Sequence, residues 1–330
     1  MPNQLTLDER ITITDLRHQD LGPTEIGRRI GRPASTITRE IGRNSDAAGH
    51  YHYTHAQQQH DQRRSTASAR SWTRNAPLLA YVRKGIRRHW SPEQISGRLG
   101  RLFPRNPRMW ISHETIYQWL YREHELGRGH VQKLRRRHPR RRSRNVGERQ
   151  GQRGKIPGRV GIEERPAAVE DRRRFGDWES DTVEGAKGTE LLVTLIERKS
   201  RVVLIGKVRD KKAVTVTAAI IALLGSLPSM LKRTITADNG KEFAGFAEVD
   251  AALGCRTYFA NPHAPWERGA NENTNGLIRD WFPKGHDLRS VSAARVAQVQ
   301  AMLNNRPRKT LDYRTPLEVI NRLPGVAFQI

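Results

Sequence analysis

The feature that most constrains the fold is an alternation of apolar runs and helical segments between residues 176 and 279. Residues 191–196 and 202–208 are continuous apolar runs around the turn residues Arg198, Lys199 and Ser200, which predicts a buried hairpin. The predicted strands are 176–184, 191–196, 202–208, 231–237 and 256–260, and the predicted helices are 214–224, 242–253 and a segment that begins at 266. This order of strands and helices predicts an α/β domain with a mixed five-stranded sheet.

Acidic residues occupy special places in this pattern. Asp238 follows the apolar run 231–237 and precedes Asn-Gly, so it lies at the mouth of a strand. Asp181 lies in the middle of the first predicted strand, which we expect at the centre of the sheet, beside the strand that ends at Asp238. The last helix has a polar face whose positions recur at steps of four, three and four, and they are Arg268, Glu272, Asn275 and Arg279.

Three ionised carboxylates that meet in one site repel one another, and a divalent cation removes this penalty. Mg²⁺ uses few protein carboxylates and keeps waters and substrate phosphates as its other ligands, which suits phosphodiester chemistry. We therefore interpret Asp181, Asp238 and Glu272 as candidate metal ligands. On spacing, the weaker candidates are Asp177, Glu179 and Glu267.

Four sequence blocks resemble one family. GDWESDTV, TADNGKEF and PWERGANENTNGLIR, with RPRKTLDYRTPLEV further on, are similar to the catalytic domain of bacterial insertion sequence 30 family transposases. Asp238 and Glu272 lie 34 positions apart, which matches the acidic-triad spacing of that family. The resemblance implies a ribonuclease H-like catalytic domain in which Asp181, Asp238 and Glu272 hold Mg²⁺, with Mn²⁺ as a possible substitute. It also implies that Arg279 is the basic residue that accompanies the glutamate.

The reaction expected from such a site is two-metal phosphoryl transfer on DNA. Arg279 and Lys241 are expected to orient the phosphate. Asparagines that support the geometry rather than react are Asn239, Asn273 and Asn275. The chain departs from the family pattern at Ser180, where glycine is usual, and at Glu184, where an apolar residue is commoner. Glu184 affects the assignment only if it competes for metal.

The charge of the chain predicts a polyanionic partner. There are 59 Lys and Arg against 34 Asp and Glu, a formal net charge of +25. Residues 51–150 carry most of the excess, with 23 basic and 6 acidic side chains. A membrane surface is disfavoured because the most apolar stretch, 218–224, is too short to span a bilayer. A single cysteine, Cys255, excludes an intrachain disulfide, and no signal-peptide core is visible. We expect the protein at the nucleoid of a reducing bacterial cytoplasm.

Residues 5–44 predict three helices with a break at Gly22-Pro23 and a tight turn at 31–33. Apolar isoleucines fall on the inward faces of the second and third helices, and the outward face of the third is short and polar. This is a helix-turn-helix pattern, in which the second helix of the motif enters the major groove of DNA. A small bundle for protein contact is the alternative. The candidate DNA contacts are Ser35, Thr36, Thr38, Arg39 and Arg43.

Residues 91–121 repeat this layout, beginning with a capping box at Ser91. The connection between the two helices is longer here, so a structural three-helix unit is an alternative to a second DNA-binding module. Its candidate DNA contacts are Ser112, His113, Thr115 and Gln118. Residues 133–144 form an arginine-rich block that we expect to become ordered on phosphate. The candidate contacts of this block are Arg135, Arg136, Arg137, Arg140, Arg141 and Arg142.

These observations predict a multidomain chain in which all-α helix-turn-helix modules precede the α/β catalytic domain. The segments are a first helix-turn-helix domain (1–48), a polar linker (49–75), a second module (76–130), a basic linker (131–170), the catalytic domain (171–290) and a helical tail (291–330). We expect a basic loop in the tail to lie along DNA or a partner subunit. Zinc is not expected at the histidines near the polar linker, because no cysteine accompanies them. They are His50, His52, His55 and His60.

As the resemblance implies, the chain is expected to bind the terminal inverted repeats of its own element and to join the cut ends to target DNA. The expected assembly is a homodimer or a larger homo-oligomer that holds two ends together. A sequence-specific repressor with an inert acidic site is one alternative, and Mg²⁺-dependent nicking separates it from an enzyme. An endonuclease of the same fold is another, and it differs by giving no joined product.

Overall fold

The computed structural model describes residues 4–125, 156–186, 188, 190–262 and 264–323. The chain divides into two compact units, Met1–Ala80 and Tyr81–Ile330. The candidate DNA contacts in the arginine block 133–144 therefore lie outside the described residues.

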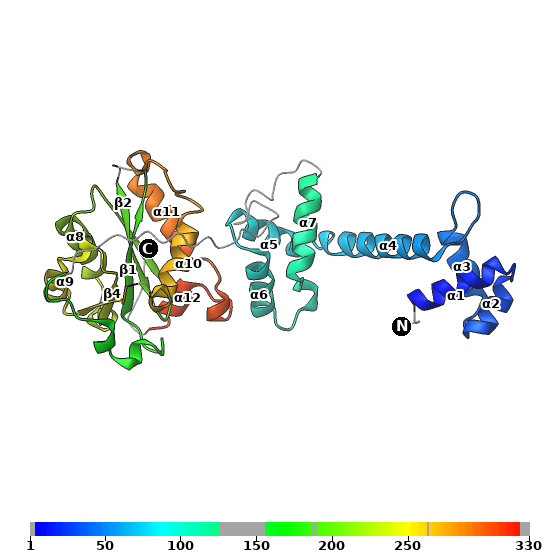
Figure 1. Ribbon diagram of the computed structural model, residues 1–330, viewed down its shortest axis with the longest axis horizontal. Coiled ribbons are helices and arrows are strands. Elements are labelled where there is room, and N and C mark those ends of the chain that lie inside the picture. Colours follow the sequence, from blue (N-terminus) through cyan, green and yellow to red (C-terminus); the bar gives the residue numbers. More distant parts are fainter. Residues whose placement is uncertain (1–3, 126–155, 187, 189, 263, 324–330) are drawn as a thin grey trace. The chain divides into compact units, whose positions relative to one another are not determined.

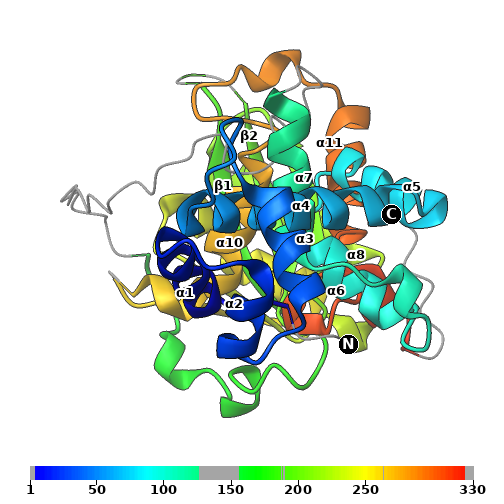
Figure 2. The ribbon, with the colours of Figure 1, turned by 90° about the vertical axis from the view of Figure 1, so that its right-hand side faces the viewer.

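The first unit is helical. Its helices are α1 (Leu7–His18), α2 (Pro23–Ile30), α3 (Ala34–Asn44) and α4 (Tyr53–Thr73). Figure 2 shows α1, α2 and α3 in dark blue, and their core contains the fully buried Ile13, Ile26 and Ile37. The turn between α2 and α3 is tight at Gly27, where an added Cβ would lie 2.6 Å from the carbonyl oxygen of Arg32. This is the helix-turn-helix arrangement that the sequence predicts.

The structure differs from the expected polar linker, because residues 53–73 form the long helix α4. The histidine ring of His52 accepts a hydrogen bond from the Thr54 N–H and caps the start of this helix. Near its first turn, Tyr51 and Ala56 are buried in the core of the first unit. Gln, Arg and Ala are good helix formers, so a polar composition alone does not indicate an unstructured segment.

The second unit contains a smaller helical module. Helix α5 (Ala76–Arg87) spans the boundary between the units, and α6 (Pro92–Leu102) and α7 (His113–Glu125) follow it. The capping box predicted at Ser91 is present, with Gln94 as its partner. Side chains at four-residue spacing on α6 and α7 are fully buried, and they are Ile95, Leu99, Ile116 and Leu120. The helical pattern predicted for 91–121 is thereby confirmed.

The remainder of the second unit is built on a mixed five-stranded sheet in the order β3-β2-β1-β4-β5 (Figure 1). Its strands are β1 (Asp177–Glu184), β2 (Leu191–Glu197), β3 (Val203–Val208), β4 (Thr234–Ala237) and β5 (Arg256–Phe259). β1 pairs antiparallel with β2 and parallel with β4, and the parallel register places Asp177 opposite Thr234. The predicted mixed sheet, with the Asp181 strand in the centre, is confirmed. This is a ribonuclease H-like domain.

Helices cover both faces of the sheet, as Figure 1 shows. One face packs against α8 (Ala213–Gly225) and α9 (Phe246–Leu253), and the other packs against α10 (Gly269–Ile278) and α11 (Ala293–Asn304). Because side chains alternate along a strand, Trp178 of β1 lies in the α8 layer and Val183 in the α10 layer. The face that carries Asp181 is therefore the face that α10 covers.

The C-terminal region is not a separate tail. Helix α11 packs on β3, and the amide of Asn304 bonds both the N–H and the carbonyl of Val203, at 2.8 and 2.7 Å. These bonds satisfy the outer edge of the sheet, which otherwise presents unpaired backbone groups. A short helix, α12 (Pro316–Ile320), follows, and its Ile320 is fully buried in the core on the α8 side. Residues 293–320 thus belong to the catalytic domain.

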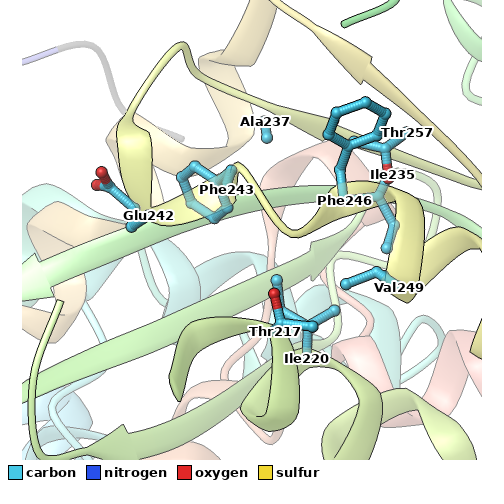
Figure 3. A pocket seen from close by; sticks show the side chains of 9 residues that line it. All are labelled: Thr217, Ile220, Ile235, Ala237, Glu242, Phe243, Phe246, Val249 and Thr257. Atoms are coloured by element: carbon cyan, nitrogen blue, oxygen red, sulfur yellow. The ribbon is translucent and has the colours of Figure 1, made fainter. Parts of the chain in front are cut away.

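A small apolar cavity of about 10 Å³ lies between α8, α9 and the sheet (Figure 3). A space of this size is at the lower limit for one water molecule, and the surrounding side chains offer few polar partners. Glu242 lines the cavity but directs its carboxylate away from it in the figure. The cavity is therefore a packing void. Its lining is Thr217, Ile220, Ile235, Ala237, Glu242, Phe243, Phe246, Val249 and Thr257.

Candidate active site

The centre of the site is the acidic face of β1. Alternate residues of a strand point to the same side, so Asp177, Glu179 and Asp181 all face the α10 layer. The first two are almost completely buried, with exposed fractions of 1% and 0%. Asp181 lies further along the strand and is partly open to solvent. A single strand face thus passes from buried acids to an accessible one.

Asp181 and Asp238 meet at one edge of the sheet. Asp238 directly follows β4, which runs parallel to β1 and beside it. One guanidinium group, that of Arg268, lies between them: its Nη1 is 3.6 Å from Oδ2 of Asp181, and its Nη2 is 3.6 Å from Oδ2 of Asp238. All three side chains are partly buried, with exposed fractions of 23%, 20% and 18%. Two carboxylates from neighbouring strands therefore share a single cation.

The carboxylate of Asp181 is held in a fixed orientation. Its Oδ1 accepts a hydrogen bond of 2.8 Å from the Thr182 N–H, and its Oδ2 accepts one of 2.9 Å from the amide of Asn275 on α10. Burial raises the pKa of Asp181, and the nearby charge of Asp238 adds to this, while Arg268 and the two hydrogen bonds lower it. The net direction of the pKa shift is upward because burial outweighs the contacts that favour the ionised carboxylate.

Glu272 lies on the same helix as Asn275, three positions before it, and its side chain is exposed. Arg268, Asn275 and Arg279 all reach β1 from this helix or its ends, at Asp181 and at the carbonyl of Glu184. Within the described ranges, no three acidic, histidine or cysteine side chains converge as a metal-binding group. The structure thus brings Asp181 and Asp238 together and leaves Glu272 on the exposed surface of α10.

A cleft of about 740 Å³ opens beside the two aspartates. Its charged lining contains as many cations as carboxylates: Asp181, Glu184, Asp238 and Glu242 against Lys211, Lys241, Arg279 and Lys284. Lys241 and Lys284 are exposed, so their ammonium groups are accessible to an anion in the cleft. The guanidinium of Arg279 donates a hydrogen bond of 2.5 Å to the carbonyl of Glu184, at the end of β1. An anionic backbone that entered this cleft would meet cations beside the acid pair.

Glu184, which would affect the metal assignment only if it competed for metal, forms an ion pair with a lysine. Nζ of Lys211 lies 2.7 Å from Oε1 of Glu184 and 3.0 Å from Oε1 of Glu242. Glu242 is buried and packs so closely against Gly240 that an added Cβ would lie 2.4 Å from its Oε2. Lys211 therefore neutralises a second pair of acids on the wall of the cleft.

The weaker candidates among the acids have structural partners. Asp177 is bound by the guanidinium of Arg174 at 2.8 Å and by the hydroxyl of Thr234 at 2.7 Å. The carboxylate of Glu267 accepts the backbone N–H of Asn261 at 2.7 Å.

Glu179 has the most elaborate contacts of these acids. Its Oε1 accepts a hydrogen bond of 2.8 Å from the buried Arg198, and its Oε2 accepts one of 3.1 Å from the N–H of Asn271 in the first turn of α10. The side chain of Asn271 in turn donates to the carbonyl of Ser180, at 3.2 Å. These bonds join α10 to β1 one turn before Asn275 reaches Asp181.

Three cations were not assigned to the site from the sequence. The sequence places Arg268 only on the polar face of the last helix, although its spacing of four from Glu272 indicates that the two side chains lie on the same side of that helix. Lys211 begins the segment before α8, and Lys284 follows α10 in a turn. Nothing in the local sequence marks either lysine, because their position at the cleft depends on the packing of the whole sheet.

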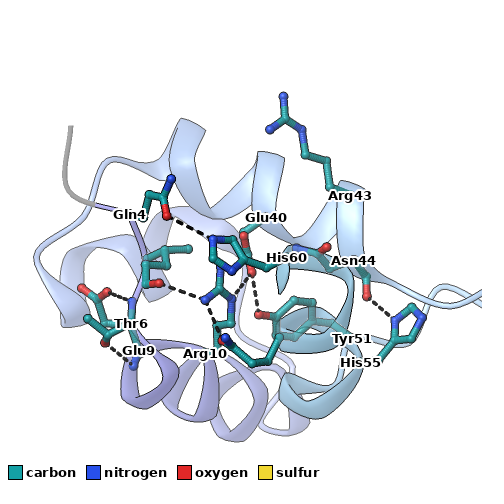
Figure 4. Close-up of polar contacts among 12 residues, drawn as sticks. Gln4, Thr6, Glu9, Arg10, Glu40, Arg43, Asn44, Tyr51, His55 and His60 are labelled. Atoms are coloured by element: carbon teal, nitrogen blue, oxygen red, sulfur yellow. Dashed lines mark hydrogen bonds and ion pairs between the residues drawn. The ribbon is translucent and has the colours of Figure 1, made fainter. Parts of the chain in front are cut away.

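In the first unit, a buried arginine organises the helix-turn-helix domain (Figure 4). Arg10 is 3% exposed, and its Nε lies 2.7 Å from Oε1 of Glu40 on α3. The same guanidinium donates to the carbonyl of Leu5 and to the side chain of Gln57 on α4, each at 2.9 Å. Tyr51 completes the network by donating to Glu40 at 3.3 Å, and burial raises the pKa of its hydroxyl. The network fixes α3 relative to α1 and α4.

With α3 fixed in this way, its predicted contact face is largely exposed. Ser35, Thr38, Arg39 and Arg43 are exposed and Thr36 is half-buried. Figure 4 shows Arg43 pointing away from the domain. Histidines on α4 have structural roles here: Nδ1 of His55 lies 3.0 Å from the carbonyl oxygen of Asn44, and His60 lies beside Gln4 and Asp61.

In the second helical module, the predicted contact residues lie at the start of α7. Ser112, His113 and Gln118 are exposed, and Thr115 is half-buried. The hydroxyl of Ser112 accepts the N–H of Thr115 at 3.1 Å, so it serves as the cap of the helix. Two tyrosines further along α7, Tyr117 and Tyr121, stack with ring centroids 6.2 Å apart.

Comparison with known proteins identifies the family. The transposase of insertion sequence element IS1086 from Cupriavidus metallidurans is 40% identical over 322 residues, which cover 96% of this chain and 94% of that protein. Transposase InsI of element IS30A from Escherichia coli is also 40% identical, over 98% of this chain and 84% of its own length. The chain belongs to the insertion sequence 30 family of transposases. A third member, from element IS4351 of Bacteroides fragilis, is 39% identical over 98% of this chain and 97% of its own.

Other comparisons concern parts of the chain. Residues 2–44 match a family described as a helix-turn-helix domain, and this transposase therefore binds DNA through its first unit. The catalytic core domain of BIV integrase covers 44% of this chain and 94% of its own, at 18% identity and a TM-score of 0.35. This transposase is an enzyme of the DDE class. Among the described residues, no helix is both long and apolar enough to cross a membrane.

Proposed function

We propose that this transposase binds the terminal inverted repeats of its own insertion sequence and carries out Mg²⁺-dependent strand cleavage and strand transfer. Asp181, Asp238 and Glu272 are the proposed metal ligands, and Arg279 is the proposed basic partner. One observation carries this proposal: Asp181 and Asp238 stand on neighbouring strands around the single guanidinium of Arg268, each 3.6 Å from it.

One unsatisfied oxygen beside the acid pair supports a bound cation. Oδ1 of Asn275 is buried and lacks a hydrogen-bond partner among the described residues, and the buried, unpartnered Nε and Nη1 of Arg268 are cationic donors that suit a phosphate oxygen rather than a metal ion. Buried polar atoms are normally paired, so their presence here indicates a site that is completed by an occupant. Oxygen donors from carboxylates suit Mg²⁺, and Mn²⁺ accepts the same ligands. The residues present therefore fit a hard divalent cation.

Glu272 supplies the third carboxylate in this proposal. It shares a helix face with Asn275, whose amide contacts Asp181, and its exposed side chain is accessible to a ligand. The bonds from Glu179 to Asn271 fix the start of this helix against β1. The position of Glu272 thus depends on a rigid element rather than on a loop.

The remaining residues bind and orient the DNA strand. Lys241 and Lys284 are exposed on the cleft wall and are suited to neutralise phosphates. Asn275 and the Thr182 N–H hold both oxygens of Asp181, so its orientation is set before substrate binds. A divalent cation, when bound, supplies Lewis-acid stabilisation of negative charge on the phosphoryl oxygens. No protein nucleophile is required.

DNA recognition is assigned to α3 of the first unit and, in part, to α7 of the second. We further propose that two copies of the chain hold two element ends together, because strand transfer joins both ends to one target. The proposed contacts on α3 are Ser35, Thr36, Thr38, Arg39 and Arg43, and those on α7 are Ser112, His113, Thr115 and Gln118.

The experiment is a cleavage assay of the full chain on a labelled duplex that carries a candidate element end. The expected result is nicked and joined product with Mg²⁺, none with chelator, and none for Asp181→Ala or Asp238→Ala, although both variants still retard the duplex in a gel. Binding without cutting by the wild-type chain would indicate a repressor. Cutting without any joined product would indicate an endonuclease.

A further inference from the structure

Residues 306–318 lie against helix α6 through a set of polar contacts. The guanidinium of Arg98 bonds the carboxylate of Glu318, with one contact at 2.7 Å, and the carbonyl of Tyr313 at 3.0 Å. Arg101 forms an ion pair with Asp312. Arg306 donates to Gln94 at 2.9 Å and Lys309 pairs with Glu93 at 2.7 Å, which extends the contact to the start of α6.

At the centre of this contact, an aromatic ring packs directly against the backbone of helix α6. Gly97 of α6 faces the ring of Tyr313, and an added Cβ would lie 2.2 Å from the ring atom Cζ. Gly100, one turn further along the same helix, has nothing within 4 Å of such a Cβ. Glycine is costly in the middle of a helix, so its presence at position 97 is explained by the approach of the ring.

The loop that presents this ring has a strained backbone. Asp312 and Tyr313 both adopt positive φ, at 53° and 55°, a conformation that side chains other than glycine rarely take. The Tyr313 N–H bonds the carbonyl of Arg308 at 2.9 Å, and the Arg308 N–H bonds the carbonyl of Arg314 at 3.0 Å. Such strain persists where the surrounding structure requires it.

These contacts also change the interpretation of the basic C-terminal loop. From the sequence we expected its cations to lie along DNA or a partner subunit. Instead, Arg306 and Lys309 bond residues of α6, and Arg308 is buried.

We propose that Gly97, Arg98, Tyr313 and Glu318 form a coupling interface. It holds the second helical module on the catalytic domain, so that DNA bound by α7 presents a fixed phosphate to Asp181 and Asp238. This inference rests on the proposed function for its effect on DNA cleavage, but the contact between α6 and residues 306–318 can be tested without DNA.

The test compares Gly97→Ala with Gly100→Ala in the full chain. Both changes add one methyl group to the same helix, and only the first meets the Tyr313 ring. Hydrogen exchange in residues 308–314 should accelerate in Gly97→Ala and remain unchanged in Gly100→Ala. On a labelled element end, Gly97→Ala should lose cleavage on the order of 10²-fold and spread the cut over several positions, because a small misplacement of a reacting group has that effect.

Replacing the ring provides the rescue. Adding Tyr313→Ala to Gly97→Ala should restore a single cut position, since the added methyl group then has space. If Gly97→Ala exchanges and cuts as Gly100→Ala does, or if the double variant shows no recovery, the coupling interface is refuted. If hydrogen exchange differs between Gly97→Ala and Gly100→Ala as expected but the wild-type chain cuts no DNA, the proposed function and the effect of the interface on cleavage are refuted. The contact between Gly97 and Tyr313 is then still supported.

Discussion

Replacing Glu179 by alanine tests how the active-site helix is held. This carboxylate is completely buried and bonds Arg198, itself only 1% exposed, at 2.8 Å. It also accepts the N–H of Asn271 in the first turn of α10, at 3.1 Å. The substitution removes both bonds at once and leaves the buried guanidinium with the exposed carboxylate of Glu170, 3.1 Å away, as its remaining ion-pair partner among the described residues.

The expected loss of stability is large. Breaking a buried ion pair by removing one partner costs about 3–5 kcal/mol, because the remaining charge stays desolvated. The matched control is Glu184→Ala, on the same strand. Its ion pair with Lys211 is about half exposed, with side-chain exposed fractions of 61% and 47%, so it should cost less than about 1 kcal/mol. Because both acids lie on β1 and both are paired, a difference in lost stability between the two variants is due to the difference in burial.

Thermal unfolding of the full chain, followed by circular dichroism, measures this difference. For a domain of this size, about 4 kcal/mol corresponds to a decrease in Tm of about 10 °C. Glu179→Ala should show a decrease of that order and Glu184→Ala one of about 2 °C or less. Equal melting temperatures for the two variants would refute the role that we assign to the buried pair.

Two further predictions concern close packing and pH. Gly27→Ala should destabilise the protein by about 1–3 kcal/mol in urea unfolding, because its Cβ would lie 2.6 Å from the backbone carbonyl oxygen of Arg32, whereas Gly42→Ala, in open space, should not. Hydrogen bonds from Arg32 hold the pKa of Glu9 below its ordinary value of 4.5. The stabilisation from Glu9 is therefore complete above pH 4.5 and is lost as the pH falls through the lower, folded-state pKa. Melting curves of the wild type and Glu9→Gln should differ at neutral pH and converge in acid, and a constant difference would contradict the assignment.

Much of the catalytic fold follows from local patterns. The apolar runs that form β2 and β3 and the apolar helix α8 are long enough to predict buried elements from the sequence alone. Their observed bounds agree with the predicted bounds within a few residues. The adjacency of Asp181 and Asp238 also follows, because β1 and β4 are parallel neighbours and Asp238 directly follows β4 at the level of Asp181. Family resemblance supplied the third acid.

Other features depend on partners that are distant in the sequence. Asp177, Glu179 and Asp181 have the same periodicity, and only the tertiary contacts of Thr234, Arg198 and α10 decide which of them are buried. The C-terminal loop is similar. Its cations resemble a DNA-binding stretch until their contacts with α6 are known.

The central claim is that Asp181 and Asp238 form one cation site, with Glu272 as the third ligand. Titration of the full chain with Mn²⁺, followed by electron paramagnetic resonance, measures this site without any DNA. The wild-type chain should bind Mn²⁺, Asp181→Asn and Asp238→Asn should lose that binding, and Glu272→Gln should weaken it. Glu184→Gln, which changes an acid of the same cleft already neutralised by Lys211, should bind as the wild type does. Undiminished Mn²⁺ binding by Asp181→Asn would contradict the claim.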